Sequence, residues 1–201
     1  MRSIAQVAHA SEKLCKFEGI LTANSKDMES ILVFLGALSR LIPHPPNFTA
    51  MSAVALYGAS KIPDKKRALL VPVLAMVLSD AIMEGMYRMG IWAFPGFHSG
   101  MWYVYGAFMV VAMIGFWIRA QFSYGRLAIG TLCASVSFFV ITNFGVWLSG
   151  WYGYTMEGLV ACYVAAIPFF RNQVIGDVLF VVLFFGGDRV LRQVALKKQS
   201  V

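Results

Sequence analysis

Acidic residues stand inside apolar stretches of this sequence, where charged groups are rare. Asp80 and Glu84 are four positions apart, about one helical turn, within the apolar stretch 68–86. Asp177 lies near the start of the last apolar stretch, 174–187. An ionised side chain inside a bilayer costs about 2.5–3.5 kcal/mol on insertion scales, so we expect these acids to face protein or water.

Groups that could recognise a polar molecule occur on other segments. The amides of Asn47, Asn143 and Asn172 could hydrogen-bond the polar edge of a ligand. Arg40 or Arg171 could meet a carboxylate or phosphate, and nearby aromatic residues could cover a ring. The predicted ligand-binding residues are Arg40, His44, Asn47, Asp80, Glu84, His98, Asn143, Arg171, Asn172 and Asp177.

The same residues allow a purely structural interpretation. Asp80 or Asp177 could pair with Arg40 or Arg171 only to lock helices together. The protein would then be a non-transporting membrane scaffold or assembly protein. The sequence leaves this alternative open beside a binding pocket.

Motifs of common enzyme and metal sites are missing from the sequence. It has no Gly-x-x-x-x-Gly-Lys-Ser/Thr loop, no His-Glu-x-x-His and no Gly-x-Ser-x-Gly pattern. Its histidines and cysteines lack the spacing of a metal site or a disulfide framework, although His44 and His98 share one predicted side. We therefore expect no enzymatic activity, no cofactor and no metal.

The composition is that of an all-α integral membrane protein. Hydrophobic residues make up 59% of the 201 residues, charged residues make up 13%, and the mean hydropathy is +0.68. No repeat or linker divides the chain, so we expect a single transmembrane domain over residues 28–192. Residues 1–27 are expected to be an extension that is disordered or not translated, and residues 193–201 a basic cytoplasmic tail.

Apolar stretches predict six transmembrane helices. A span takes about 20 residues, and the stretches long enough to cross alone are 68–86, 101–118 and 127–148. Shorter spans are expected at 30–42, 50–62 and 174–187. The stretch 159–170 is expected to be a re-entrant or short extra helix before the last span, which Asn172 would cap.

Basic residues orient these spans, because cytoplasmic loops collect Lys and Arg. Lys and Arg gather in the loops 61–67 and 119–126 and in the C-terminal tail. The loops 87–100 and 149–157 contain a single basic residue, Arg88. Six spans then place both termini in the cytoplasm. The net charge of +7 reflects this topology, so we expect no nucleic-acid partner.

The stretch IPHPPNFT, residues 42–49, is expected to lie below the outer membrane surface. The helix before it climbs only about 22 Å, and the helix after it needs only about 20 Å to reach Lys61. Irregular backbone at such depth must be shielded by protein or line a cavity. At about 1.5 Å per residue, Asp80 and Asn143 reach a similar height. We predict that the turn is the lip of an outward-facing pocket.

Several stretches resemble a family of bacterial integral membrane proteins of unknown function. They are RLIPHPPNFTAMSAVALYGA, VPVLAMVLSDA, FHSGMWYVYGAF, ITNFGVWLSGWYGYTMEGL and AIPFFRNQVIGDVLF, within residues 28–189. That family is similar in turn to the S components of energy-coupling factor transporters. The stretch RNQVIGD, with Asn172 and Asp177, is similar to the N…GD pattern that opens their last helix.

This resemblance implies an S-component-like bundle of six helices in the bacterial inner membrane. It implies a transport subunit that captures a small vitamin- or precursor-like molecule from outside. Its partners would be the lipid bilayer, that ligand and, to supply energy, a transmembrane T component with ATPases. S components commonly dock the T component through small residues on their first helix, whereas here the pair Ala55 and Ala59 falls on the second.

Overall fold

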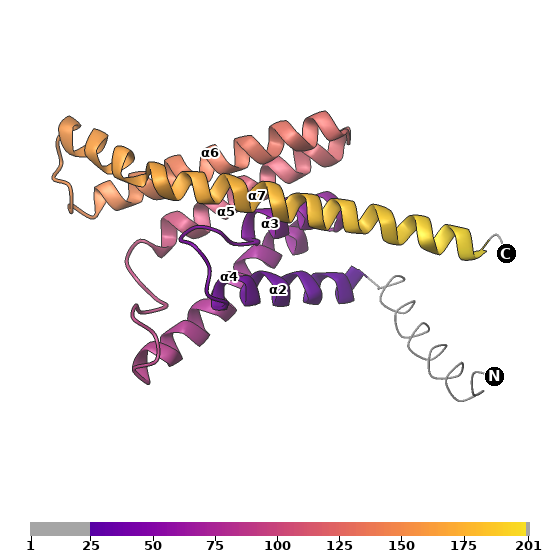
Figure 1. The fold of residues 1–201 in the computed structure, drawn as a ribbon, viewed down its shortest axis with the longest axis horizontal. Helices are drawn as coiled ribbons and strands as arrows, with labels where there is room; N and C mark the ends of the chain where they lie inside the picture. The colour runs from indigo at the N-terminus through magenta and orange to yellow at the C-terminus, as the bar shows by residue number, and fades with distance from the viewer. Residues whose placement is uncertain (1–24, 200–201) are drawn as a thin grey trace, which may run out of the picture.

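The computed structural model describes the backbone of residues 25–199 and the side chains of residues 29–190 and 193. All regular structure in this part is helical, which confirms the all-α prediction for it (Figure 1). Its six helices are α2 (Ser25–Leu41), α3 (Met51–Lys61), α4 (Lys65–Arg88), α5 (Met101–Ala120), α6 (Tyr124–Leu148) and α7 (Met156–Gln199). Of the predicted extension 1–27, residues 1–24 lie outside the described part, and the last three residues already belong to α2.

Four of the helices are long and apolar enough to cross a membrane, namely α4, α5, α6 and residues Met156–Val190 of α7. The first three contain the stretches that were predicted to cross alone. Large apolar side chains such as Leu74, Val136 and Val182 remain exposed on these helices. Continuous apolar surface of this kind is suited to contact with lipid rather than water, so the fold is that of a membrane protein.

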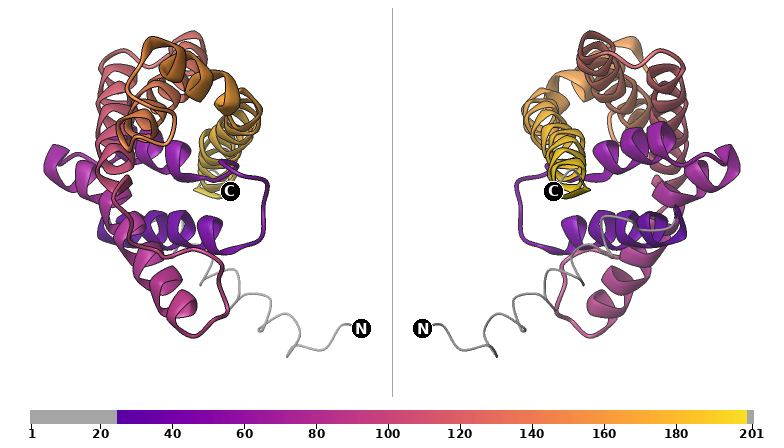
Figure 2. Two further views of the ribbon diagram at one scale, coloured as in Figure 1. Left: turned by 90° about the vertical axis from the view of Figure 1, so that its left-hand side faces the viewer. Right: turned by 90° about the vertical axis from the view of Figure 1, so that its right-hand side faces the viewer.

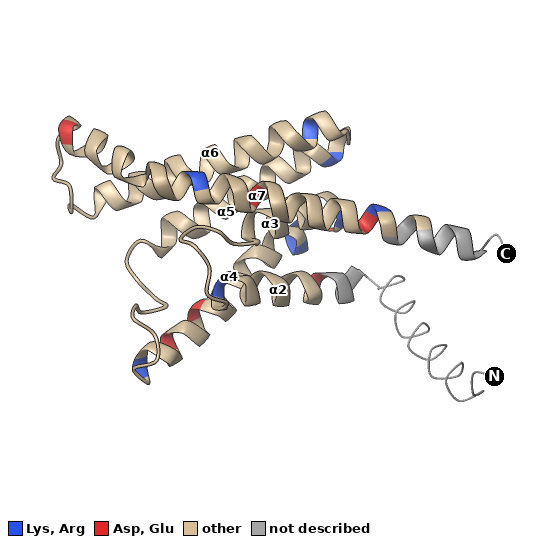
Figure 3. Ribbon diagram, viewed as in Figure 1, with Lys and Arg blue, Asp and Glu red and all other residues tan. Residues whose placement is uncertain are grey.

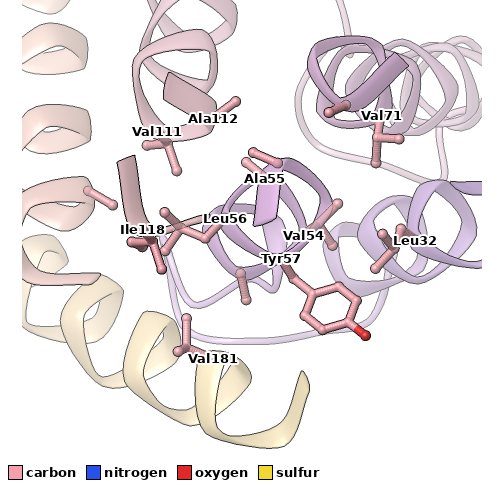
Figure 4. Close-up of a cluster of buried hydrophobic side chains, with 14 of the residues drawn as sticks. Leu32, Val54, Ala55, Leu56, Tyr57, Val71, Val111, Ala112, Ile118 and Val181 are labelled. Atoms are coloured by element: carbon pink, nitrogen blue, oxygen red, sulfur yellow. The ribbon is translucent and has the colours of Figure 1, made fainter. Parts of the chain in front are cut away.

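Helix α3 is the centre of the bundle. It contacts all five other described helices, and nine of its 11 residues, 51–59, are buried. Figure 4 shows its side chains directed toward Leu32 of α2, Val71 of α4, Val111 of α5 and Val181 of α7. A helix that is apolar all round is typically buried. The short helix α3 is therefore surrounded by protein rather than by lipid.

Small residues allow α3 to lie close to α5. A Cβ atom on Gly115 of α5 would come within 2.6 Å of the Ala59 Cβ atom and 2.9 Å of the Leu56 carbonyl oxygen. Ala55 and Ala59 are both fully buried in the bundle. The pair noted in the sequence therefore serves packing within this chain, and it offers no outer surface to another subunit.

Helix α7 continues without interruption from Met156 to Gln199, with Pro168 in its interior. The stretch 159–170 and the last predicted span are therefore one helix, and the predicted N-cap at Asn172 is wrong. Proline has no backbone N–H to donate, and its ring clashes with the carbonyl four residues earlier. A helix that continues through a proline is therefore usually bent there. Figure 2 shows such a bend between the orange and yellow parts of α7. The predicted tail at 193–199 continues the helix.

The connections between helices gather at two ends of the bundle. The α3–α4 and α5–α6 connections lie at one end, called here the basic end, and the other three lie at the opposite end, called the loop end (Figure 1). The basic end takes its name from Lys61, Lys65, Lys66, Arg67, Arg119 and Arg126. Figure 3 shows long uncharged stretches of helix between the charged residues of the two ends.

Candidate functional site

A cavity of about 460 Å³ lies among the helices toward the loop end. This volume falls within the range of about 300–1,000 Å³ that is usual for small-molecule sites. All six described helices contribute to its wall, with Arg40 (α2), Ser52 (α3), Asp80 (α4), Phe108 (α5), Asn143 (α6) and Gln173 (α7). The α2–α3 connection adds His44 and Asn47, and the α4–α5 connection adds Trp92 and His98.

The α2–α3 connection forms one lip of the cavity through a tight turn. The Phe48 N–H donates to the Pro45 carbonyl at 3.0 Å, and Asn47 has a φ of 63°. Pro46 in the second position and a positive φ in the third are the pattern of a type II turn. Asparagine tolerates this left-handed backbone better than most residues, which accounts for Asn47 in the sequence.

Helix α7 holds this turn in place. The Asn172 Nδ2 donates to the Pro46 carbonyl at 3.3 Å. Phe48 packs against Gly176, where a Cβ atom would lie 3.3 Å from the Phe48 Cα atom, and its ring meets Phe180 edge-on at 5.7 Å. In Figure 1 the ends of α4 and α6 and the start of α7 all extend beyond the turn. The turn is therefore recessed relative to the ends of these helices and packs against the last helix, while its depth below the outer membrane surface stays a prediction.

One polar cluster joins three helices through Asp80, which is only 1% exposed. The Arg40 Nη1 lies 2.6 Å from Asp80 Oδ1 and also donates to the Ser79 hydroxyl and to the Met76 carbonyl. The Tyr105 hydroxyl donates to the second Asp80 oxygen, Oδ2, at 2.7 Å. Both carboxylate oxygens therefore have partners from the protein, and α2, α4 and α5 are tied together at the cavity wall.

A second polar cluster surrounds Asp177, which is 2% exposed. Its Oδ2 accepts from the Ser135 hydroxyl at 2.6 Å and from the Gln173 Nε2 at 3.5 Å, and the Ser52 hydroxyl also bonds to the carboxyl group. No basic side chain of the described part forms an ion pair with it. The Gln173 Nε2 also donates to the Ser135 carbonyl at 3.0 Å, and the buried Gln173 Oε1 has no partner.

Seven of the ten predicted residues line this cavity, namely Arg40, His44, Asn47, Asp80, His98, Asn143 and Asp177. The other three do not. Glu84 accepts from the Arg88 Nε at 2.9 Å near the C-terminal end of α4. Arg171 is exposed on α7, and Asn172 contacts the back of the turn.

A comparison with protein-family models gives a match over residues 24–199, which contain all six helices and the cavity. The matching model is described as a family of unknown function, DUF6580. The chain belongs to this family. Neither a curated protein nor a solved structure matches the chain at a significant level.

Several polar residues of this DUF6580 cavity escaped the sequence interpretation, above all Gln173 and the hydroxyls of Ser52 and Ser135. Gln173 precedes Asp177 by four residues, so helical spacing alone could have placed both on one face. Isolated serines in apolar helices usually bond to their own backbone, as Ser135 also does to the Thr131 carbonyl at 3.1 Å. Their spacing therefore carried no signal for a shared site.

The DUF6580 cavity combines these polar groups with apolar lining. The apolar side chains in its wall include Met51, Met76, Val104, Phe108 and Phe138. Small-molecule sites typically have this character, with a few placed polar groups among apolar and aromatic side chains. The arrangement suits the binding of a small, partly apolar molecule.

Proposed function

We propose that this protein is a membrane solute-binding subunit that captures a small, vitamin- or precursor-like molecule in the cavity. The observation that carries this proposal is Gln173, a residue of the cavity wall that is 3% exposed and has a buried Oε1 without a partner. A buried acceptor without a partner costs roughly 1–3 kcal/mol. A donor on a bound molecule would remove that cost, and the neighbouring Asp177 carboxyl would strengthen the same contact.

The proposed orientation places the cavity toward the outside of the cell. In this arrangement the basic end faces the cytoplasm of the bacterial inner membrane, because cytoplasmic loops collect Lys and Arg. The helices α2 and α3 act as short spans, since their recessed turn lies inside the bundle, and both termini are cytoplasmic. Six spans in this order constitute an S-component-like bundle.

Transport from such a site requires an energy source outside this chain, since the sequence has no Gly-x-x-x-x-Gly-Lys-Ser/Thr loop. A transmembrane T component with ATPases would supply it, as in the transporters that the sequence resembles. Ala55 and Ala59 are buried, so a T component would have to dock on a different surface.

A membrane scaffold is the second candidate, and the Arg40–Asp80–Tyr105 cluster favours it. The hydrogen bonds of Asp80 are all supplied by the protein, as expected of a group that only locks helices. The two candidates differ at Asn143, which lines the cavity while its Nδ2 bonds only to the Phe139 carbonyl of its own helix, at 2.8 Å.

Solvent extraction of the purified protein, followed by mass spectrometry of small molecules, separates the two candidates. The protein should be taken from native membranes in parallel as the wild type, Asn143→Ala and Ser149→Ala. Ser149 is the matched control, since its hydroxyl bonds to the Val146 carbonyl near the end of the same helix and lies outside the cavity. Capture predicts a molecule present with the wild type and Ser149→Ala and depleted in a folded Asn143→Ala. Equal recovery from all three proteins, or no molecule from any, would favour the scaffold.

A further inference from the structure

Along α6 and α7 most of the hydrogen-bond donors in the cavity wall are already used within the protein. The Asn143 Nδ2 donates to the Phe139 carbonyl and the Thr142 hydroxyl to the Phe138 carbonyl, each at 2.8 Å. The Gln173 Nε2 donates to the Ser135 carbonyl at 3.0 Å. These side chains therefore present acceptors to the cavity, with few donors left for a ligand.

Several hydrogen-bond acceptors in this wall lack a full set of donors from the protein. The Gln173 Oε1 is buried without a partner, and its donor contacts fix which end of the amide is the oxygen. The Asp177 carboxyl receives only neutral donors, from Ser135, Ser52 and Gln173. The Asn143 Nδ2 donates to the Phe139 carbonyl of its own helix, which leaves the Asn143 Oδ1 and one amide N–H without a partner from the described residues. A ligand that brings donors fits this wall.

The formal charge of the wall points in the same direction. Its lining contains one arginine and two aspartates, so its formal charge is −1 when both histidines are neutral. Arg40 is held by Asp80 at 2.6 Å, which leaves Asp177 without a counter-charge. An anionic ligand would add a second unpaired charge to a buried site, whereas a cation would neutralise the first.

We infer that the captured molecule is a small organic cation, with an amine, amidinium or amino-substituted ring nitrogen directed at Asp177, Gln173 and Asn143. Its apolar body contacts Met76, Phe108 and Phe138 in the same cavity. A metal ion is disfavoured, because the described residues contain no group of three or more His, Cys, Asp or Glu that could hold one. This inference rests on the proposed function, and it replaces the expected carboxylate or phosphate at Arg40 or Arg171.

Three probes of one ring size test this inference on the full chain in lipid nanodiscs. They are benzamidinium, benzamide and benzoate, and their affinities follow from the shift in melting temperature with probe concentration. We expect benzamidinium to bind most tightly and benzoate least. Asp177→Asn should weaken benzamidinium at least about tenfold, or about 1.4 kcal/mol, with little effect on neutral benzamide. Ser149→Ala should change none of the three affinities.

A gain-of-affinity variant keeps the test decisive if Asp177→Asn does not fold. Asn143→Asp adds a third carboxylate to the cavity wall, the second without an arginine partner, and should tighten benzamidinium binding while weakening benzoate binding. The inference is overturned if benzoate binds as tightly as benzamidinium, if both variants bind benzamidinium like the wild type, or if benzamidinium does not stabilise the protein. If the solvent extract contained an anionic molecule, the inference of a cationic ligand would be wrong while the proposed capture of a solute would stand. If the extract contained no molecule although benzamidinium bound tightly, the proposed capture would be wrong while the preference for cations would stand.

Discussion

The Arg40 Nη1 and the Asp80 Oδ1 lie 2.6 Å apart and join α2 to α4 at the wall of the cavity. The Asp80 side chain is 2% exposed and the Arg40 side chain 17%. Burying such a pair costs desolvation energy, so the pair contributes little compared with a well-packed apolar contact. Removing one partner is different, because it leaves the other charge buried and unpaired.

Asp80→Ala should therefore lower the free energy of unfolding by about 3–5 kcal/mol. Asp80→Asn should cost less, because it keeps an oxygen for the Tyr105 hydroxyl. Thermal melting of both variants in detergent measures the effect, with Arg88→Ala as the control, since the pair of the mostly exposed Arg88 with Glu84 is weak. If Asp80→Ala melted at the same temperature as the wild type, the Arg40–Asp80 pair would not be what holds the helices together.

Gly115→Val should destabilise the protein by about 1–3 kcal/mol through overpacking, because α3 and α5 cannot separate without disturbing the buried centre. The added Cβ atom would meet Ala59 and the Leu56 carbonyl oxygen. Gly106→Val on the same helix is the matched control, since a Cβ atom there has no neighbour within 4 Å. Equal melting temperatures for the two variants would contradict the close contact between α3 and α5.

Asp64 should stabilise the start of α4 in a pH-dependent way. Its carboxylate accepts from the backbone N–H groups of Arg67 and Lys66, at 3.2 and 2.8 Å, and these bonds lower the pKa of Asp64 below its ordinary value of 3.8. A carboxyl group with a lowered folded-state pKa stabilises the fold above its unfolded pKa. That contribution is lost as the pH falls through the folded-state value.

The measurement is the melting difference between the wild type and Asp64→Ala as a function of pH. The wild type should melt higher at neutral pH, and the difference should shrink once the pH falls below 3.8. A difference that persists unchanged in acid would mean that the carboxylate is not the group that caps the helix.

Much of the fold could be predicted, because long apolar helices are a strong signal. The stretches 68–86, 101–118 and 127–148 lie within α4, α5 and α6, and the helix-length argument correctly placed the turn at 42–49 below the neighbouring helix ends. The break expected before Asn172 is absent, since packing holds α7 together through Pro168.

The candidate site was only partly predictable, because long-range pairing leaves no pattern along the chain. The heights counted at about 1.5 Å per residue placed Asp80 and Asn143 at a similar level, and both residues line the cavity. It could not show that Arg40 is occupied by Asp80, or that Ser135 and Gln173 surround Asp177. These partners are more than 35 residues apart, apart from Gln173 and Asp177 themselves.

Single-cysteine labelling in intact cells should place the two ends of the bundle on opposite sides of the membrane. In a chain without its natural cysteines, Trp151→Cys at the loop end should react with a membrane-impermeant maleimide, because Trp151 is 87% exposed. Lys65→Cys at the basic end should react only after the cells are permeabilised. External labelling at position 65 would mean that the topology is opposite to the one proposed and that the cavity does not open to the outside.

Native mass spectrometry of the protein released from membranes tests the central claim most directly. The claim is that the cavity beside Gln173 and Asp177 holds one small molecule per chain. The account predicts a wild-type peak heavier than the bare chain by the mass of one small molecule, and the loss of that peak in Asn143→Ala with the fold retained. A wild-type spectrum with the bare chain alone, or an adduct that Asn143→Ala retains in full, would contradict it.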